Sequence, residues 1–265
     1  HRRIAEAGIK VVIEGQGVDE ILAGYNYFRA AYHGDLLRKG ECTMLRHEVR
    51  ASADPAAELR ALRQQIGGQS ANTYQVGTSH LNLQTLSQDF LSFAQTPPSF
   101  PAPFKDGLRN VLFRDLRYTK LPRVLRMNDR LSMAHGIELR EPFLDHRIVE
   151  YAFRLPAHQR IRQGNSKWLL RQAMRKRLPP SICFAAKRAV VTPQREWLAG
   201  PLRDWMEDTL RSQAFTNCGL FNVAAVQKSL QHFYKEGANN TFFIWQWINT
   251  AIWFKRYSSS TKFNQ

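Results

Sequence analysis

The chain has 265 residues, of which 43% are hydrophobic and 23% charged, a composition typical of a globular protein rather than a disordered one. Its most apolar stretch, residues 242–254, is shorter than the roughly 18 unbroken apolar residues of a membrane span and contains Gln246 and Asn249, which excludes a membrane-spanning helix. The net charge of +16 indicates an anionic partner, which is either a nucleic acid or a small phosphorylated and acidic substrate.

The first predicted element is a short buried strand over residues 10–13, indicated by adjacent β-branched residues. A polar turn, Gly15-Gln16-Gly17, follows the strand. Asp19 and Glu20 then begin a helix predicted over 19–31, because acidic side chains suit the positive end of the helix dipole. Ligands bind outside the carboxyl ends of parallel strands, so the turn is a candidate ligand site in which Asp19 would hold a metal or cap the helix. A plain strand-to-helix connection is the equally weighted alternative.

The rest of the chain reads as mostly helical, with little strand signal after Ile13. Helical patterns cover 35–65, 105–120, 124–135, 166–178 and three segments after Pro201. Residues 66–78, rich in Gly, Ser, Asn and Thr, are the predicted loop or insertion, and the prolines of 97–103 mark a second break. In the helix over 166–178, Ser166 is the predicted cap. The sequence therefore predicts an α/β protein in which this part is largely helix.

Acids and arginines alternate over residues 126–145 around an apolar Pro-Phe-Leu. The pairs Asp129–Arg130 and Glu138–Arg140 are candidates for ion pairs, and an arginine there would also suit a substrate carboxylate. A purely bracing role is an equal alternative. Two histidines flank the run without metal-site spacing, so a packing or surface role is predicted for both, His135 and His146.

Three features remain to be interpreted. Lys187, on a predicted loop, would neutralise phosphate charge, or is one more surface lysine. The aromatic tail, with Trp245, Trp247, Trp253 and Phe254, is predicted to be core rather than a base-stacking surface. Because the basic residues are spread over helices without a zinc-finger or RNA-recognition motif, a site for a small anionic substrate is favoured over nucleic-acid binding.

The cysteines indicate the compartment. Cys42, Cys183 and Cys218 are odd in number and far apart, which excludes a disulfide framework and a zinc-ligand spacing and predicts a reducing, cytoplasmic location. The chain begins without Met, and its first residues read as the end of a helix rather than a signal peptide. We therefore expect it to be part of a longer protein.

Three stretches together resemble the synthetase domain of glutamine-dependent asparagine synthetases. They run from Val11 to Tyr25, from Leu121 to Asp145 and from Gly164 to Pro193. The run from Asp129 to Arg140, with Pro142-Phe-Leu-Asp145 after it, is similar to the most recognisable signature of that family. The motifs that continue it in order are Ser166-Lys167, Leu170-Arg171, Leu178-Pro179 and Lys187. The resemblance predicts one partial synthetase domain over 1–265, with a variable, insertion-like region over 35–103.

The resemblance implies a fold and a reaction. The fold is the carboxyl-terminal, mostly helical part of an ATP pyrophosphatase-type α/β domain with a parallel sheet, which is adenine nucleotide alpha hydrolase-like. The enzymes of this family adenylate the side-chain carboxylate of aspartate with MgATP, and ammonia from glutamine then displaces AMP to give asparagine. The implied cofactors are ATP and Mg²⁺, and the implied substrates are small molecules, with no membrane partner. A homodimer is an allowed assembly.

The matched positions would divide the work among them. Gln16, Lys187 and Arg140 would be the catalytic residues, and Lys187 would steady the departing pyrophosphate. Asp19 would bind magnesium. The residues implied in nucleotide and substrate binding are Gly15, Gln16, Gly17, Tyr25, Asp129 and Glu138.

One departure from the family matters most. Many asparagine synthetases have Ser-Gly-Glu or Ser-Gly-Asp where this chain has Glu14-Gly15-Gln16. An amide orients a substrate but cannot take a proton from ammonia, so a related enzyme that acts on another carboxylate, of the β-lactam or lasso-peptide cyclising type, is the alternative. A catalytically dead relative is a further one.

Two parts of such an enzyme are absent from the sequence. They are a pyrophosphate-gripping Ser-Gly-Gly-x-Asp-Ser loop and an amino-terminal cysteine glutaminase domain. We expect both to lie upstream of His1, and we expect the isolated chain to be inactive.

Overall fold

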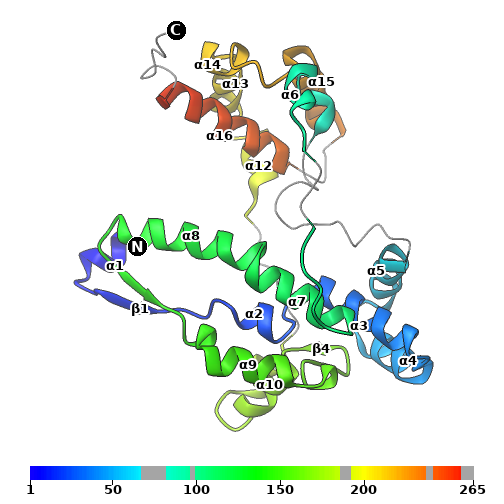
Figure 1. The fold of residues 1–265 in the computed structure, drawn as a ribbon. Helices are drawn as coiled ribbons and strands as arrows, with labels where there is room; N and C mark the ends of the chain where they lie inside the picture. Colours follow the sequence, from blue (N-terminus) through cyan, green and yellow to red (C-terminus); the bar gives the residue numbers. More distant parts are fainter. Residues whose placement is uncertain (67–81, 96–98, 186–191, 237–240, 258–265) are drawn as a thin grey trace. The chain divides into compact units, whose positions relative to one another are not determined.

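The computed structural model describes residues 1–66, 82–95, 99–185, 192–236 and 241–257. The chain divides into two compact units, each with its own core (Figure 1). Unit 1 comprises His1–Val76 and Ser99–Arg188, and unit 2 comprises Gly77–Pro98 and Ala189–Gln265. The predicted loop over 66–78 lies outside the described residues except for its first position, Ile66, which ends a helix.

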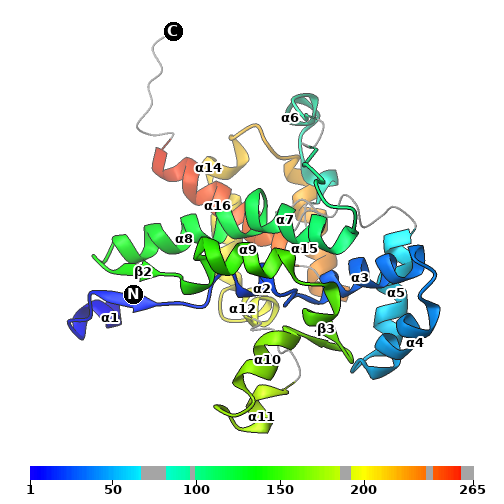
Figure 2. The same ribbon diagram turned by 60° about the horizontal axis from the view of Figure 1, so that its bottom comes forward.

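Unit 1 contains a small parallel sheet. Strand β1 (Val11–Ile13) pairs with β2 (Glu138–Arg140) in a register that joins Val11 to Glu138 and Ile13 to Arg140. Figures 1 and 2 show the two strands side by side, with α8 (Lys120–Met133) leading into β2. The strand predicted over 10–13 is confirmed for Val11–Ile13, but the prediction that it is buried was wrong, because Val11 is 40% and Ile13 72% exposed in this two-stranded sheet. Strand β2 escaped prediction because a Glu-Leu-Arg triplet is too short to show a period and reads as an ion pair.

The rest of unit 1 is mostly helical. The helices that precede residue 99 are α1 (Arg2–Glu6), α2 (Val18–Ile21), α3 (Asn26–Arg38), α4 (Cys42–Ala51) and α5 (Pro55–Ile66). Those that follow, besides α8, are α7 (Gly107–Arg117), α9 (His146–Arg154), α10 (Trp168–Met174) and α11 (Pro180–Cys183). Short 3₁₀ turns, η3 (Pro142–Leu144) and η4 (Ala157–Gln159), flank α9, and a hairpin of β3 (Ile161–Arg162) and β4 (Asn165–Ser166) precedes α10.

Two helices are shorter in the structure than the sequence predicts. The helix over 19–31 is broken after α2, because Ala23 adopts φ of +57° and starts a turn that leads into α3. The helix over 166–178 begins only at Trp168, since Ser166 belongs to β4, where it pairs with Ile161. The cap position falls to Lys167, which has φ of +56°, so the prediction that Ser166 caps this helix was wrong.

The core of unit 1 lies where α3 packs against α7. Its buried residues are Ala23, Phe28, Tyr32, Leu36, Leu108, Leu112 and Ile161, with a second cluster of Ile21, Leu22 and Ala152 beside it. Residues from the break after α2 therefore belong to both clusters. Helix α2 is consequently held by the apolar core.

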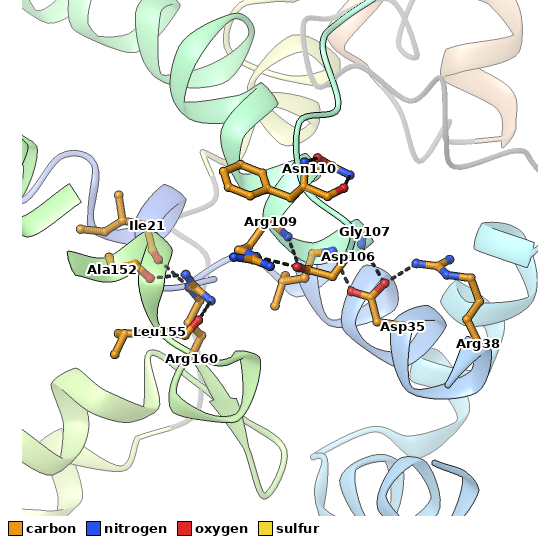
Figure 3. Close-up of polar contacts among 12 residues, drawn as sticks. Ile21, Asp35, Arg38, Asp106, Gly107, Arg109, Asn110, Ala152, Leu155 and Arg160 are labelled. Atoms are coloured by element: carbon orange, nitrogen blue, oxygen red, sulfur yellow. Dashed lines mark hydrogen bonds and ion pairs between the residues drawn. The ribbon is translucent and has the colours of Figure 1, made fainter. Parts of the chain in front are cut away.

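The start of α7 is anchored by two aspartates (Figure 3). Asp106 caps the helix by accepting the Arg109 N–H at 2.9 Å. Asp35, which lies on α3 and is buried, accepts the N–H groups of Gly107 at 2.7 Å and of Leu108 at 2.9 Å. Because the first N–H groups of a helix lack partners within it, these carboxylates both satisfy them and meet the positive end of the dipole.

Arg160 is fully buried beside this helix start. Its guanidinium donates to the carbonyl oxygens of Ile21 at 3.2 Å and Leu155 at 2.8 Å, and also to that of Ala152 (Figure 3). Burial lowers its pKa to about 10, which leaves the group charged at neutral pH. Arg160 thereby ties the end of α2 to the end of α9. We name Asp35, Asp106 and Arg160 the anchor cluster.

Unit 2 is helical. Its elements are η2 (Leu83–Thr85), α6 (Gln88–Ser92), α12 (Gln194–Ala199), α13 (Arg203–Arg211), α14 (Gln213–Thr216), α15 (Val223–Glu236) and α16 (Phe242–Tyr257). The core prediction for the aromatic tail is confirmed for Trp247, which is 2% exposed, and wrong for Trp245 and Trp253, which are 39% and 56% exposed. They lie on the outer face of α16, because a helix buries only one stripe. In the described ranges, no helix is both long and apolar enough to cross a membrane.

Candidate functional site

The turn after β1 is shaped by Gly17. This residue has φ of +88° and precedes α2, whose Ile21 N–H bonds to its carbonyl at 3.0 Å. A side chain at this position would collide with the side chain of Leu144 from η3. Both the left-handed backbone and the close approach therefore require glycine. At Gly15, in contrast, an added Cβ would meet no atom within 4 Å, so packing makes no such demand there.

Asp19 lies in the first turn of α2 and pairs with a cation. Its Oδ1 is 2.6 Å from Nζ of Lys167, and the two side chains are 20% and 22% exposed. The Lys167 N–H also donates to the Leu22 carbonyl at 3.1 Å, and a side chain at Gly24 would collide with the Asp19 carboxylate. The break after α2 thus brings an acid and a lysine far apart in sequence into one partly open ion pair.

The residues around Asp19 fit only a magnesium site in which the protein supplies one or two carboxylates. In the described part of the chain, no group of three or more His, Cys, Asp or Glu could hold a metal by itself. Magnesium commonly takes one or two carboxylates and completes its shell with phosphate oxygens and water. Asp19, partly exposed in the first turn of α2, suits that role, whereas the described residues form no cage made only of these side chains.

Behind Asp19 lies a buried acid bound to a tyrosine. Glu20 is 2% exposed and accepts the Tyr25 hydroxyl at 3.0 Å. Burial raises the pKa of Glu20, while the bond from Tyr25 partly offsets this. Burial and the charge of Glu20 raise the pKa of Tyr25, so its phenol stays protonated. The predicted site residue Tyr25 therefore serves as a hydrogen-bond donor to Glu20.

Lys120, at the start of α8, covers this tyrosine. Its Nζ lies 3.2 Å from the centroid of the Tyr25 ring, a cation–π contact. Tyr27 stacks on Tyr25 with ring centroids 5.5 Å apart and donates to Asp115 on α7 at 2.5 Å. Burial lowers the pKa of Lys120, and the charges of Glu20 and Asp115 oppose this shift. Lys120 thus lies over the two tyrosines and within the electrostatic field of two acids.

Two further acids stand at the end of the sheet. Oε2 of Glu141 accepts the main-chain N–H of Gln16 at 3.2 Å, and Oε2 of Glu14 accepts from Nδ2 of Asn128 at 3.2 Å. Gln16 is half-buried, and its hydrogen bond to Glu141 fixes its backbone. Burial, together with the charge of Glu14, raises the pKa of Glu141.

The residues predicted on the substrate side have mixed outcomes. The Glu138–Arg140 ion pair is confirmed at 2.7 Å, although both side chains are more than half exposed. The Asp129–Arg130 pair was wrong, because these neighbours on α8 form no ion pair in the described structure, and Asp129 is exposed. Adjacent positions on a helix point in different directions, which accounts for this. Lys187 lies outside the described residues.

The structure brings together residues that the sequence interpretation left without roles. Lys167 stands in the Ser166-Lys167 motif, and its position in a matched motif was the available signal. Lys120 precedes Pro122 at a helix start and carried no signal. Glu141 interrupts the otherwise apolar continuation of β2, and a carboxylate at that point was visible but was read as part of an acid-arginine pattern.

A separate cavity of about 800 Å³ opens elsewhere in unit 1. Its lining comes from the end of α3, the start of α4 and the segment 158–163, and includes Tyr32, Cys42, His47 and His158. None of the predicted site residues lines it. The strand-end turn and this cavity are therefore distinct places in unit 1.

Comparisons with known proteins give the family. The asparagine synthase family model matches residues 1–255. A putative glutamine-hydrolysing asparagine synthetase of Mycobacterium bovis is 26% identical over 95% of this chain and 40% of its own length. The glutamine-hydrolysing asparagine synthetase 1 of Bacillus subtilis is 22% identical over 94% of this chain and 41% of its own length.

A third relative has a different name. The protein called amidase chyE of Penicillium rubens is 25% identical over 84% of this chain and 38% of its own length. The chain thus spans about two fifths of the length of these curated relatives. With a family model that matches nearly the whole sequence, the chain belongs to the asparagine synthase family.

Proposed function

We propose that this chain is the synthetase part of a longer ATP-dependent, amide-forming ligase that adenylates a carboxylate and then aminates it. The observation that carries the proposal is the position of Asp19 in this chain, which belongs to the asparagine synthase family. Asp19 follows the glycine turn at the carboxyl end of a parallel strand, where α/β folds bind ligands, and is paired with Lys167.

The chemistry assigns roles to this chain's residues. The turn at 15–17 would approach the nucleotide, and Asp19 would hold magnesium, which when bound neutralises phosphate charge. Lys167, which pairs with Asp19, would offer its charge to a phosphate oxygen of the bound nucleotide. Lys187 is proposed to steady the departing pyrophosphate. The ATP pyrophosphatase-type fold of this domain is also part of the proposal.

Aspartate, with asparagine as product, is the first proposed substrate, and this rests on the printed names of the relatives. Another carboxylate is the second, favoured by Gln16 at the position where many asparagine synthetases have an acid and by the relative called an amidase. A glutaminase domain as the source of ammonia, a cytoplasmic location and a homodimer also remain proposals for the longer protein.

The test is ATP–pyrophosphate exchange by the complete protein, with aspartate first and the other amino acids after it. Asp19→Asn removes the charge that would hold magnesium, so exchange should fall by about 100-fold, corresponding to a few kcal/mol of lost charge stabilisation. The matched control is Asp204→Asn, which changes an exposed acid in the first turn of α13. Exchange by Asp19→Asn at the wild-type rate would contradict the role assigned to Asp19. If no carboxylic acid supports exchange by the wild type, the proposed function is contradicted.

A further inference from the structure

Two carboxyl groups end the parallel sheet side by side. The register joins Ile13 to Arg140, so the next residues along the two strands are Glu14 and Glu141. The Glu14 N–H continues the ladder by donating to the Arg140 carbonyl at 2.9 Å. The two main chains therefore deliver two acids to the edge at which the Gly15–Gly17 turn begins.

The surroundings of this strand-end carboxyl pair supply few donors. Oε2 of Glu141 has the Gln16 N–H, but its Oε1 is buried and receives no hydrogen bond from a donor group among the described residues. Glu14 is the neighbour of Glu141 in the strand register, and its charge raises the pKa of Glu141. Because burial and the charge of Glu14 raise the pKa of Glu141, these two neighbouring acids take up a proton more readily than a lone carboxylate does.

The pair has no evident value for stability. Like charges directly across two strands are destabilising, and an apolar pair at the end of a β ladder would serve the fold better. In the described part of the chain, neither acid forms an ion pair that would offset the repulsion. The groups that face the pair are the Gln16 backbone from the turn and Asn128 from α8, both uncharged. Like-charge pairs of this kind are typical of active sites, where they shift pKa values.

The proposed reaction needs what the pair offers. When ammonia attacks an acyl-adenylate, the nitrogen must lose a proton, and the amide side chain of Gln16 cannot accept it. The strand-end carboxyl pair lies next to Gln16 and is bonded to its backbone.

We propose that Glu14 and Glu141 together are the proton acceptor of the amination step, an inference that rests on the proposed function. The nitrogen lone pair forms the new C–N bond to the acyl carbon. The C–O bond to the AMP phosphate breaks, and AMP leaves with that electron pair. One N–H proton passes to the carboxyl pair, which returns it to water after the product leaves.

The experiment separates the two half-reactions of the complete protein. ATP–pyrophosphate exchange, with the amino acid that supports it best, needs no nitrogen nucleophile, whereas amide formation is measured with ammonium chloride as the nitrogen source. We expect Glu14→Gln and Glu141→Gln to leave exchange within about twofold of the wild type and to lower amide formation by about 100-fold, a typical contribution of a general base. Glu150→Gln, which changes an exposed acid on α9, is the control and should alter neither rate.

A rescue variant distinguishes catalysis from support of the fold. Gln16→Glu in the Glu141→Gln background places a carboxylate where many family members have one, and should recover at least tenfold of the lost amide formation. At a fixed concentration of free ammonia, we expect amide formation by the wild type to rise with pH, the profile of Glu141→Gln to be flat and the rise to return in the rescue variant.

Each outcome has a defined meaning. Normal exchange and normal amide formation in Glu141→Gln would overturn this inference and leave the proposed function intact. An equal loss of both half-reactions without rescue would also overturn it, because it would mean a structural role. Absence of exchange in the wild type with every amino acid would overturn the proposed function, and this inference with it.

Discussion

Unit 1 contains two groups of buried or half-buried charged residues, and the two groups differ in the partners that surround them. In the anchor cluster, Asp35 receives two main-chain N–H groups and Arg160 is surrounded by carbonyl oxygens. At the strand-end carboxyl pair, Glu141 has one N–H and otherwise another acid. Charges with matched partners hold the fold together, and charges placed against their own kind indicate a site.

The largest effect is expected for Arg160→Met. The change leaves three buried carbonyl oxygens without their donor, at about 1–3 kcal/mol each, so the free energy of unfolding should fall by about 3–5 kcal/mol. Urea denaturation followed by tryptophan fluorescence measures it. The control Arg154→Met, at an 80% exposed side chain, should change the free energy by less than about 0.5 kcal/mol. Equal losses in the free energy of unfolding for the two variants would contradict the stabilising role of Arg160 in the anchor cluster.

A middle effect is expected for Asp35→Ala. Two N–H groups at the start of α7 lose their acceptor, so the loss should be about 2 kcal/mol, more than the roughly 1 kcal/mol of an ordinary cap. Asp54→Ala provides the ordinary case, because this exposed acid caps α5 through the single Ala57 N–H. The same denaturation curves serve. A loss at Asp35 no larger than at Asp54 would contradict its role as a second cap.

The smallest effect, with the opposite sign, is expected for Glu141→Gln. A raised pKa means that the folded state keeps its proton longer than the unfolded chain, so this group's contribution to stability is present at low pH and is lost as pH rises from the ordinary value of 4.5 through the raised pKa. The variant should lack this loss and be about 0.5 kcal/mol more stable than the wild type at pH 8. Denaturation midpoints from pH 4 to 8 measure it. A variant that is less stable at every pH would make the pair part of the structural framework.

Much of the site was predictable because its causes are local. The β-branched run predicts β1, and two glycines before adjacent acids predict a turn into a helix whose positive end suits Asp19. The signature from Asp129 onward indicated the family, which the match over residues 1–255 confirms. These features depend on neighbouring residues, whose preferences are visible in the sequence itself.

Other features arose only from contacts between distant parts of the chain. Strand β2 exists because it pairs with β1 more than 120 residues away, and its three residues carry no periodic pattern of their own. The break at Ala23 and the pairing of Asp19 with Lys167 depend on the β3–β4 hairpin, which presents that lysine. Sequence alone therefore determined the strand, the turn, its acid and the family. The tertiary structure decided which cation meets Asp19 and that Glu14 and Glu141 stand together, because parallel pairing sets neighbours by register rather than by sequence distance.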